Sequence, residues 1–253
     1  MKAYLTNALL LPVALLLGLL LAGQSYAQSV TGREDWDYSV EAYLWGPDID
    51  IETADGSNQE VKFSDLVDVT RGGFMGGFYA QQEKWRFGVD AIYLDADERI
   101  KAPVEEGVEL NRLDLEVWYV SPTVAYQVAR YDRSQFYVFG GVRYLWAEPT
   151  ATLRTDDPLP PGKSDVSESD GVWDGIVGIH GITRLGERWY LDYLADIGAG
   201  DSDAVYQLLV GLNHRFKRFD ATAGYRYIRW DLDSSLFNEI KFNGFYAGAK
   251  IYF

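Results

Sequence analysis

The chain has 253 residues and a formal net charge of −15, from 38 acidic against 23 basic residues. This acidity excludes nucleic acid as an expected partner, and the absence of cysteine excludes a disulfide framework. Beyond the N-terminal segment, no apolar run approaches the ~20 residues of a membrane-spanning helix, although aromatic residues make up 15% of the chain.

The N-terminal segment has the features of a secretory signal peptide. Lys2 gives it a positive start, residues 8–22 are apolar, and Ser25-Tyr26-Ala27 places small residues at the −3 and −1 positions of a cleavage site. We therefore expect residues 1–27 to be the signal peptide and residues 28–253 to form the mature protein. The alternative is an uncleaved anchor helix, but polar sequence follows at once and no basic flank stops transfer.

Five segments that begin with an aromatic residue alternate between apolar and polar positions. In each of them every second residue over nine positions is apolar, aromatic or glycine, whereas the intervening positions carry charges such as Glu41, Asp90 and Arg143. This period of two predicts β-strands with one apolar and one polar face. The segments are 36–44, 85–93, 136–144, 189–197 and 219–227.

Five further strands fit between and after these segments, which gives ten in all. About 9–11 residues suffice for a tilted strand to cross a bilayer, and each of the ten is about that long or longer. In the second of the added strands the alternation changes phase at Ser121-Pro122, where we predict a bulge. The added strands are Gly72–Gln81, Leu113–Val128, Trp173–Thr183, Ala204–Phe216 and Phe245–Phe253.

The connections between these strands alternate in length. Tight turns fall at residues 82–84, 131–134, 185–188 and 217–218, and mostly longer loops fall at 46–70, 95–111, 147–173, 198–203 and 231–240. This is the plan of an antiparallel up-and-down barrel with short periplasmic turns and long extracellular loops. A further hairpin around Asp55-Gly56 in the first loop would change the number of strands, so eight or twelve strands are alternatives to ten.

A soluble lipocalin-like barrel or a β-sandwich would also alternate, with its apolar face turned inward. Three features favour an all-β transmembrane barrel instead: the signal segment, the aromatic residues near both ends of the strands, and the final Phe253. The aromatic residues expected at the outer membrane interface are Tyr93, Tyr144, Trp146, Tyr227 and Trp230.

Several of these segments resemble small Gram-negative outer-membrane β-barrel proteins, which usually carry only a generic outer-membrane or porin-like name. The similar segments are Glu41–Pro47, Phe74–Ala80, Trp85–Asp95, Gly140–Trp146 and Gly224–Trp230, together with Phe253. The resemblance covers most of the mature chain and implies the bacterial outer membrane as location, with both termini in the periplasm. It further implies contact with lipid and lipopolysaccharide, and Phe253 as the signal for the barrel-assembly machinery. It carries no catalytic residues.

Ten strands should enclose a narrow polar lumen, because eight strands leave an interior that side chains just fill. Charged residues there must be paired or hydrated. The lumen is therefore either a plug of ion pairs, which the small diameter favours, or a narrow pore that prefers cations, because acids outnumber bases among the candidates. The candidate lumen residues are Glu41, Arg86, Asp90, Asp114, Glu116, Arg143, Asp174, His180, Asp192, Asp196, Arg226 and Lys250.

The long connections hold 24 of the 38 acidic residues. A solvated outer rim is the simplest interpretation of such charge. A functional alternative is the binding of divalent cations, which could bridge to lipopolysaccharide phosphates. Asp48, Asp50 and Glu52 offer oxygen ligands of the kind that Ca²⁺ and Mg²⁺ prefer, although no EF-hand spacing is present.

No catalytic motif stands out. His180 and His214 lie close to short turns, whereas proteolytic ten-stranded barrels place their histidine at the extracellular rim, and a lipid hydrolase needs a serine beside its histidine. We therefore expect no enzyme and no cofactor. The sequence predicts a structural or narrow-pore barrel, with surface binding or adhesion through the loops as the alternative and an outer-membrane hydrolase as the third hypothesis.

Overall fold

The computed structural model describes residues 36–53, 56–64, 70–98, 102–105, 108–155, 164–167, 170–232 and 237–253. The expected signal peptide, residues 1–27, lies outside these ranges. Ten long strands dominate the fold: β1 (Asp37–Thr53), β3 (Thr70–Gln82), β4 (Trp85–Glu98), β6 (Val108–Arg130), β7 (Ser134–Thr155), β9 (Asp170–Arg184), β10 (Trp189–Gly200), β11 (Ala204–Arg215), β12 (Phe219–Asp231) and β13 (Phe237–Tyr252).

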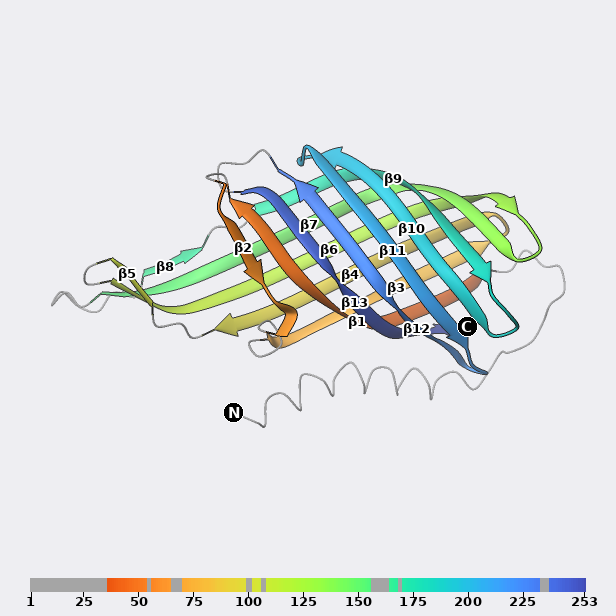
Figure 1. The fold of residues 1–253 in the computed structure, drawn as a ribbon, viewed down its shortest axis with the longest axis horizontal. Helices are drawn as coiled ribbons and strands as arrows, with labels where there is room; N and C mark the ends of the chain where they lie inside the picture. The colour runs from red at the N-terminus through yellow and green to blue at the C-terminus, as the bar shows by residue number, and fades with distance from the viewer. Residues whose placement is uncertain are drawn as a thin grey trace.

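These strands form a closed antiparallel barrel (Figure 1). Each pairs with its neighbours in chain order, and β1 pairs with both β3 and β13, which closes the sheet. At the closing seam, Tyr38 and Phe253 exchange two backbone hydrogen bonds of 3.2 and 3.0 Å, beside the short turns of the barrel. The predicted ten-stranded up-and-down barrel is confirmed.

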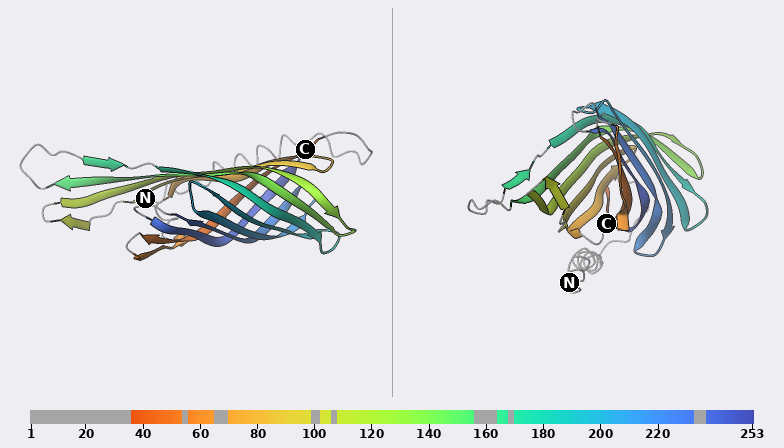
Figure 2. Two further views of the ribbon diagram at one scale, coloured as in Figure 1. Left: turned by 90° about the horizontal axis from the view of Figure 1, so that it is seen from above. Right: turned by 60° about the vertical axis from the view of Figure 1, so that its left-hand side comes forward.

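Several predicted loops are instead strand for much of their length. The pairing of β6 with β7 runs from Arg130 opposite Gln135 to Val108 opposite Thr155. Two short strands, β5 (Ala102–Glu105) and β8 (Ser164–Ser167), add to the flanks of this pair. The four strands project past the rest of the barrel on the side away from the short turns (Figures 1 and 2). Backbone hydrogen bonds between strands form whether or not a strand has an apolar face. The pairing of β6 with β7 therefore continues into the part of the sequence where the alternation is weak.

The hairpin expected around Asp55-Gly56 is present. Strand β2 (Asn58–Val61) returns along β1, with Glu52 opposite Asn58 and Ile49 opposite Val61. Gly56 has a φ of 82°, a left-handed conformation that glycine adopts without steric cost. The hairpin lies beside the barrel wall and adds no transmembrane strand.

The bulge predicted at Ser121-Pro122 is wrong. The pairing of β6 with β4 is uninterrupted from Leu113 to Tyr126, and the two irregularities against β7 lie between Leu110 and Arg112 and between Gln127 and Ala129. By this register Pro122 falls opposite Val142 and has no N–H to donate to it. The hydroxyl of Ser121 donates to the Val142 carbonyl instead, at 3.3 Å.

The two faces of the barrel are inverted relative to a soluble protein. Val177, Leu208 and Phe245 are 63%, 56% and 77% exposed on the outside, whereas Arg143 and Asp174 are each 1% exposed inside. A continuous outward apolar belt of this kind needs lipid around it. The soluble barrel with an inward apolar face is therefore excluded.

Aromatic side chains cluster at both margins of the belt. Near the short turns Trp85 packs on Tyr126 with ring centroids 4.9 Å apart. Towards the other end Tyr93 lies 4.5 Å from Trp118, and Tyr144 lies 4.3 Å from Trp173. Such girdles mark the two interfaces of a transmembrane barrel.

Within the described ranges, no helix is long and apolar enough to cross a membrane.

Replacing Leu208 by arginine tests the lipid-facing assignment. A cation at mid-belt should lower the free energy of unfolding by about 2–4 kcal/mol, because it must enter hydrocarbon. Urea unfolding of the barrel in lipid vesicles measures this loss. Asp132→Arg, in the exposed turn between β6 and β7, should change stability by less than about 0.5 kcal/mol. Equal effects of the two substitutions would contradict the assignment.

Candidate functional site in the barrel lumen

An arginine at mid-height organises the lumen. Arg226 of β12 is 3% exposed, and its guanidinium lies 2.9 Å from the Asp90 carboxylate of β4. It also donates to the hydroxyls of Tyr43 and Tyr119, at 3.0 and 2.9 Å, and to the amide oxygen of Gln207. The Tyr43 hydroxyl in turn donates to Asp90 at 2.6 Å. One side chain thus connects five strands across the lumen.

A second ion pair extends this network. Arg143 of β7 donates to Asp196 of β10 at 2.8 Å, and the two side chains are 1% and 0% exposed. The amide nitrogen of Gln207 donates to the same carboxylate oxygen at 3.0 Å. Since Gln207 also accepts from Arg226, both arginines belong to one network. This network, which we call the arginine layer, comprises Tyr43, Asp90, Tyr119, Arg143, Asp196, Gln207 and Arg226.

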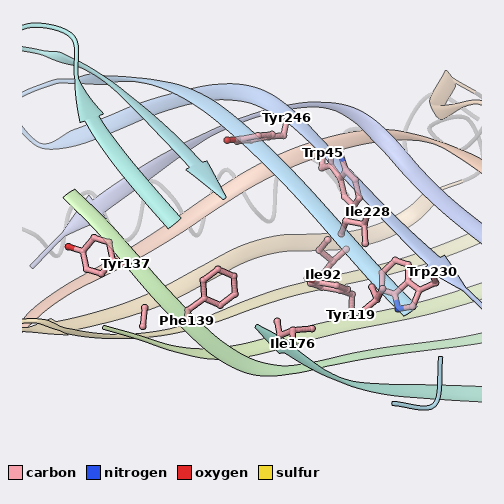
Figure 3. Close-up of a cluster of buried hydrophobic side chains, with 11 residues drawn as sticks. Trp45, Ile92, Tyr119, Tyr137, Phe139, Ile176, Ile228, Trp230 and Tyr246 are labelled. Carbon is pink, nitrogen blue, oxygen red and sulfur yellow. The ribbon is translucent and has the colours of Figure 1, made fainter. Parts of the chain in front are cut away.

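Next to the arginine layer, on the side away from the short turns, apolar side chains gather in the lumen as an apolar layer, and Figure 3 shows Trp45, Ile92, Tyr119, Ile228 and Trp230 close together. Trp45 and Trp230 are 5% and 1% exposed, and Ile92 and Ile228 fill the space beside them. The guanidinium of Arg226 lies 4.9 Å from the Trp45 ring, a cation–π distance that joins the two layers.

Trp230 was expected in the outer aromatic girdle, and this prediction is wrong. It follows Arg226 and Ile228 at steps of two on β12, so all three point inward. Its indole N–H donates to Asp174 at 3.2 Å, and that carboxylate also accepts from the backbone and hydroxyl of Ser202. The hydrogen-bond acceptors of Asp174 are thereby occupied at the end of the apolar layer that lies away from the short turns.

The half of the lumen near the short turns is more polar. Lys250 pairs with Glu41 at 2.9 Å, and His180 lies 3.0 Å from Asp192. Two cavities remain in this half. The central cavity, of about 140 Å³, lies against the arginine layer, and a vestibule of about 270 Å³ faces the short turns.

The structure brings most of the predicted lumen residues together. Nine of the twelve line the central cavity: Glu41, Arg86, Asp90, Arg143, His180, Asp192, Asp196, Arg226 and Lys250. Asp174 is also buried in the lumen, where it accepts hydrogen bonds from Trp230 and Ser202. The sequence prediction was based on charged residues and so omitted the neutral members Tyr43, Tyr119 and Gln207, although their place in the alternation could have identified them.

Asp114 and Glu116 do not face the lumen, so their prediction is wrong. The alternation of β6 continues through Pro122, and both residues share the outer face with Trp118. Arg71 lies 3.2 Å from Asp114, and the Trp118 indole donates to Glu116 at 3.1 Å. Without these two carboxylates, the excess of acids over bases that suggested cation preference nearly disappears.

The divalent-cation site predicted at Asp48, Asp50 and Glu52 is also wrong. These residues lie on the outer face of β1, about 6.6 Å apart from one to the next. Asp48 accepts from the backbone of Phe63 at 2.9 Å, and Asp50 accepts from Asn243 at 3.4 Å. Among the described residues, no cluster of three carboxylate or histidine side chains could hold a metal ion.

A charged rim continues from Asp50 across the outer face of the neighbouring strands. Lys241 stands opposite Asp50 and forms an ion pair with Glu239, which also pairs with Arg229 at 2.6 Å. Arg229 further contacts Asp231 at 2.6 Å. The hydrogen bond to Glu239 raises the pKa of the Lys241 ammonium.

The second histidine lies in the aromatic girdle near the short turns. The ring of His214 is 4.5 Å from both Trp189 and Phe216. His180, by contrast, is inside the lumen. The two histidines therefore do not share a site.

No known family model and no curated protein sequence matches the chain. Solved structures with a similar fold include neisserial surface protein A, at 15% identity over 86% of this chain and 97% of that one, with a TM-score of 0.36. The attachment invasion locus protein Ail of Yersinia pestis is 9% identical over 87% and 100%, with a TM-score of 0.37. The transport unit of the autotransporter AIDA-I from Escherichia coli is 10% identical over 93% and 95%, with a TM-score of 0.42.

This chain is a barrel of the outer-membrane type. Its closed antiparallel sheet, outward apolar belt and paired aromatic girdles are the defining features of that architecture. The expected resemblance to small outer-membrane barrels is confirmed for the architecture. Scores this low carry no argument about function.

Removing the central arginine should destabilise the barrel strongly. In Arg226→Met the carboxylate of Asp90 stays in the lumen without its cation, which should cost about 3–5 kcal/mol of unfolding free energy. Urea unfolding in lipid vesicles measures the loss. Arg229→Met on the outer rim removes a partly exposed arginine and leaves the buried Glu239 paired with Lys241, so it should cost less than about 1 kcal/mol. Similar losses in both variants would mean that the arginine layer contributes little.

Proposed function

We propose that this protein is a structural outer-membrane barrel whose lumen is closed at rest. The observation that carries the proposal is the pair of stacked layers inside it. Water or an ion that enters from the short turns meets the arginine layer first and the apolar layer behind it. An ion in the apolar layer would lose hydration without gaining a partner, which is costly.

The competing function is a narrow pore. The central cavity and the vestibule can hold water, since a single molecule needs only ~10–15 Å³ of probe volume. Passage would still require Trp45 and Trp230 to separate, and Arg226 to leave Asp90. A preference for cations has little support, because the interior acids are nearly matched by interior bases. We therefore place the closed barrel ahead of the pore.

Surface binding or adhesion is the second candidate function, and the extension formed by β5, β6, β7 and β8 favours it. Strands that rise past the aromatic girdle add nothing to the membrane-spanning wall, yet they carry the sheet into the space above it (Figure 2). In this proposal the barrel is the anchor and the extension is the working surface. Replacing residues 99–112 by an Asn-Gly turn should leave the free energy of unfolding in vesicles unchanged. The same change should abolish the attachment of cells that display the protein to the surface that the extension binds.

The orientation and partners in this proposal follow from charge. The short turns and both termini face the periplasm, and the charged rim faces outward among lipopolysaccharide headgroups. Arg229 and Lys241 would contact headgroup phosphates, directly or through divalent cations shared with the surrounding carboxylates. Phe253 would serve assembly of the barrel. The protein would have no catalytic activity and no cofactor, since His180 is paired inside the lumen and His214 is packed among aromatic rings.

Single-channel recording in planar bilayers tests the closed lumen. The wild-type barrel should show no conductance steps in potassium or sodium salts. The double variant Arg226→Ser with Trp230→Ala removes one large side chain from each layer, and it should conduct because the layers no longer exclude water. Arg229→Ser with Trp118→Ala removes the same residue types from the outer face and should stay silent.

Regular, cation-selective steps from the wild-type barrel would overturn the proposal in favour of the pore. Silence of the lumen variant, if circular dichroism shows it to be folded, would mean that other side chains close the lumen.

A further inference from the structure

We propose that the vestibule near the short turns binds a small oxyanion, a phosphate or a carboxylate, on the guanidinium of Arg86. The vestibule is lined by residues of β1, β3, β4, β7, β9, β10, β11 and β13 and by the turn between β9 and β10. Its inner wall is shared with the central cavity, and the shared residues are Tyr79, Arg86, Asp192 and Lys250. Arg86 thus lies on the wall between the vestibule and the central cavity.

Arg86 differs from the other cations of the lumen. Arg143, Arg226 and Lys250 each have a carboxylate within 2.9 Å. Among the residues that the structure describes, Arg86 has no carboxylate at ion-pair distance and no hydrogen-bond acceptor. Its guanidinium rests 4.8 Å from the centre of the Tyr79 ring. Five N–H donors are therefore available to a ligand from a side chain that its aromatic neighbour holds in place.

The carboxylates close to the vestibule are already engaged. Asp192 is paired with His180, and Glu41 with Lys250. Asp220 accepts hydrogen bonds from Arg215 and from the hydroxyls of Tyr190 and Tyr252, the latter two at 2.7 and 2.9 Å. None of these carboxylates forms an ion pair or hydrogen bond with Arg86, although Asp192 attracts the guanidinium from a longer distance.

Two further cations stand near the mouth of the vestibule. Arg184 and Arg188 are exposed and line the cavity together with the acids Asp37 and Glu187. An anion entering here would pass these two arginines, with Asp37 and Glu187 beside them, before it reaches Arg86. Because the chain has a net charge of −15, an anion can bind only where basic residues are grouped locally, as they are in the vestibule.

The chemistry of the ligand follows from the guanidinium. Its planar fork donates two parallel hydrogen bonds to a carboxylate or a phosphate, and such charge-assisted pairs are stronger than neutral ones. The cavity of about 270 Å³ admits a phosphate ion or a short dicarboxylate. A lipid headgroup is disfavoured because the site faces the aqueous interior of the barrel.

Calorimetric titration of the purified barrel in detergent with inorganic phosphate, and separately with succinate, tests the proposal. At low ionic strength at least one of the two anions should bind saturably at one site. Arg86→Gln should weaken that binding about tenfold or more, because a bidentate charged contact is lost. Arg86→Lys should fall between, since it keeps the charge and loses the fork. Arg133→Gln, which removes an exposed arginine from the turn between β6 and β7, should bind as the wild type does.

The folding of the variants is checked in the same preparation. Arg86 donates to none of the described residues, so Arg86→Gln should keep the circular dichroism spectrum and unfolding temperature of the wild type, and Arg86→Lys supplies the comparison if it does not. Saturation by neither anion would overturn the proposal. So would equal binding by wild type and both Arg86 variants, or a loss in Arg133→Gln as large as that in Arg86→Gln.

Discussion

The middle of this barrel's lumen depends on the cost of leaving a fully buried cation, Arg226, without a partner. Arg226 cannot be neutralised, because the pKa of a guanidinium lies far above any relevant pH. It must therefore be surrounded by acceptors, and the barrel supplies them from β1, β4, β6 and β11. Satisfying one side chain thus ties together strands that are not neighbours in the sheet. The wall of the barrel holds its strands side by side, while the arginine layer holds opposite walls together.

The same constraint explains the order of the layers. A charged network next to open water could exchange its internal partners for solvent. Trp45, Trp230 and the two isoleucines beside them cover the network on the side away from the short turns. They keep water from that side, so each hydrogen bond of the network contributes more to stability than it would in water. The polar half near the short turns has no such cover and keeps its cavities. The lumen is consequently graded from wet to dry along the axis of the barrel.

The sequence could predict the fold because the alternation of apolar and polar residues shows which face of each strand points to lipid and which to the lumen. Nine of the twelve lumen candidates line the central cavity for this reason. The errors fall where that reference is lost. At Asp114 and Glu116 the strand has left the lipid, the apolar residues Leu113, Leu115 and Val117 occupy its other face, and Pro122 imitated a change of phase. Trp230 was assigned by its type and its place near a strand end, although Arg226 and Ile228 on the same strand give its true face.

The partners inside the lumen were beyond reach of the sequence. Whether Arg226 meets Asp90 or Asp196 depends on the stagger between strands that lie on opposite walls, and no local pattern encodes it. The divalent-cation site failed for a related reason. Asp48, Asp50 and Glu52 are close in sequence, but an extended strand spaces them too widely for one ion. Had the segment been a loop, as predicted, the same three residues could have converged.

The unequal lengths of the strands have a consequence for how the protein meets other polypeptides. Within the membrane the sheet closes on itself and has no edge at all. Above it, β6 and β7 continue as an open sheet, whose path of paired strands ends at β5 on one flank and at β8 on the other. An edge strand offers a row of backbone donors and acceptors to any extended chain that aligns with it. The protein therefore combines, in a single sheet, a portion that resists strand addition with one that invites it.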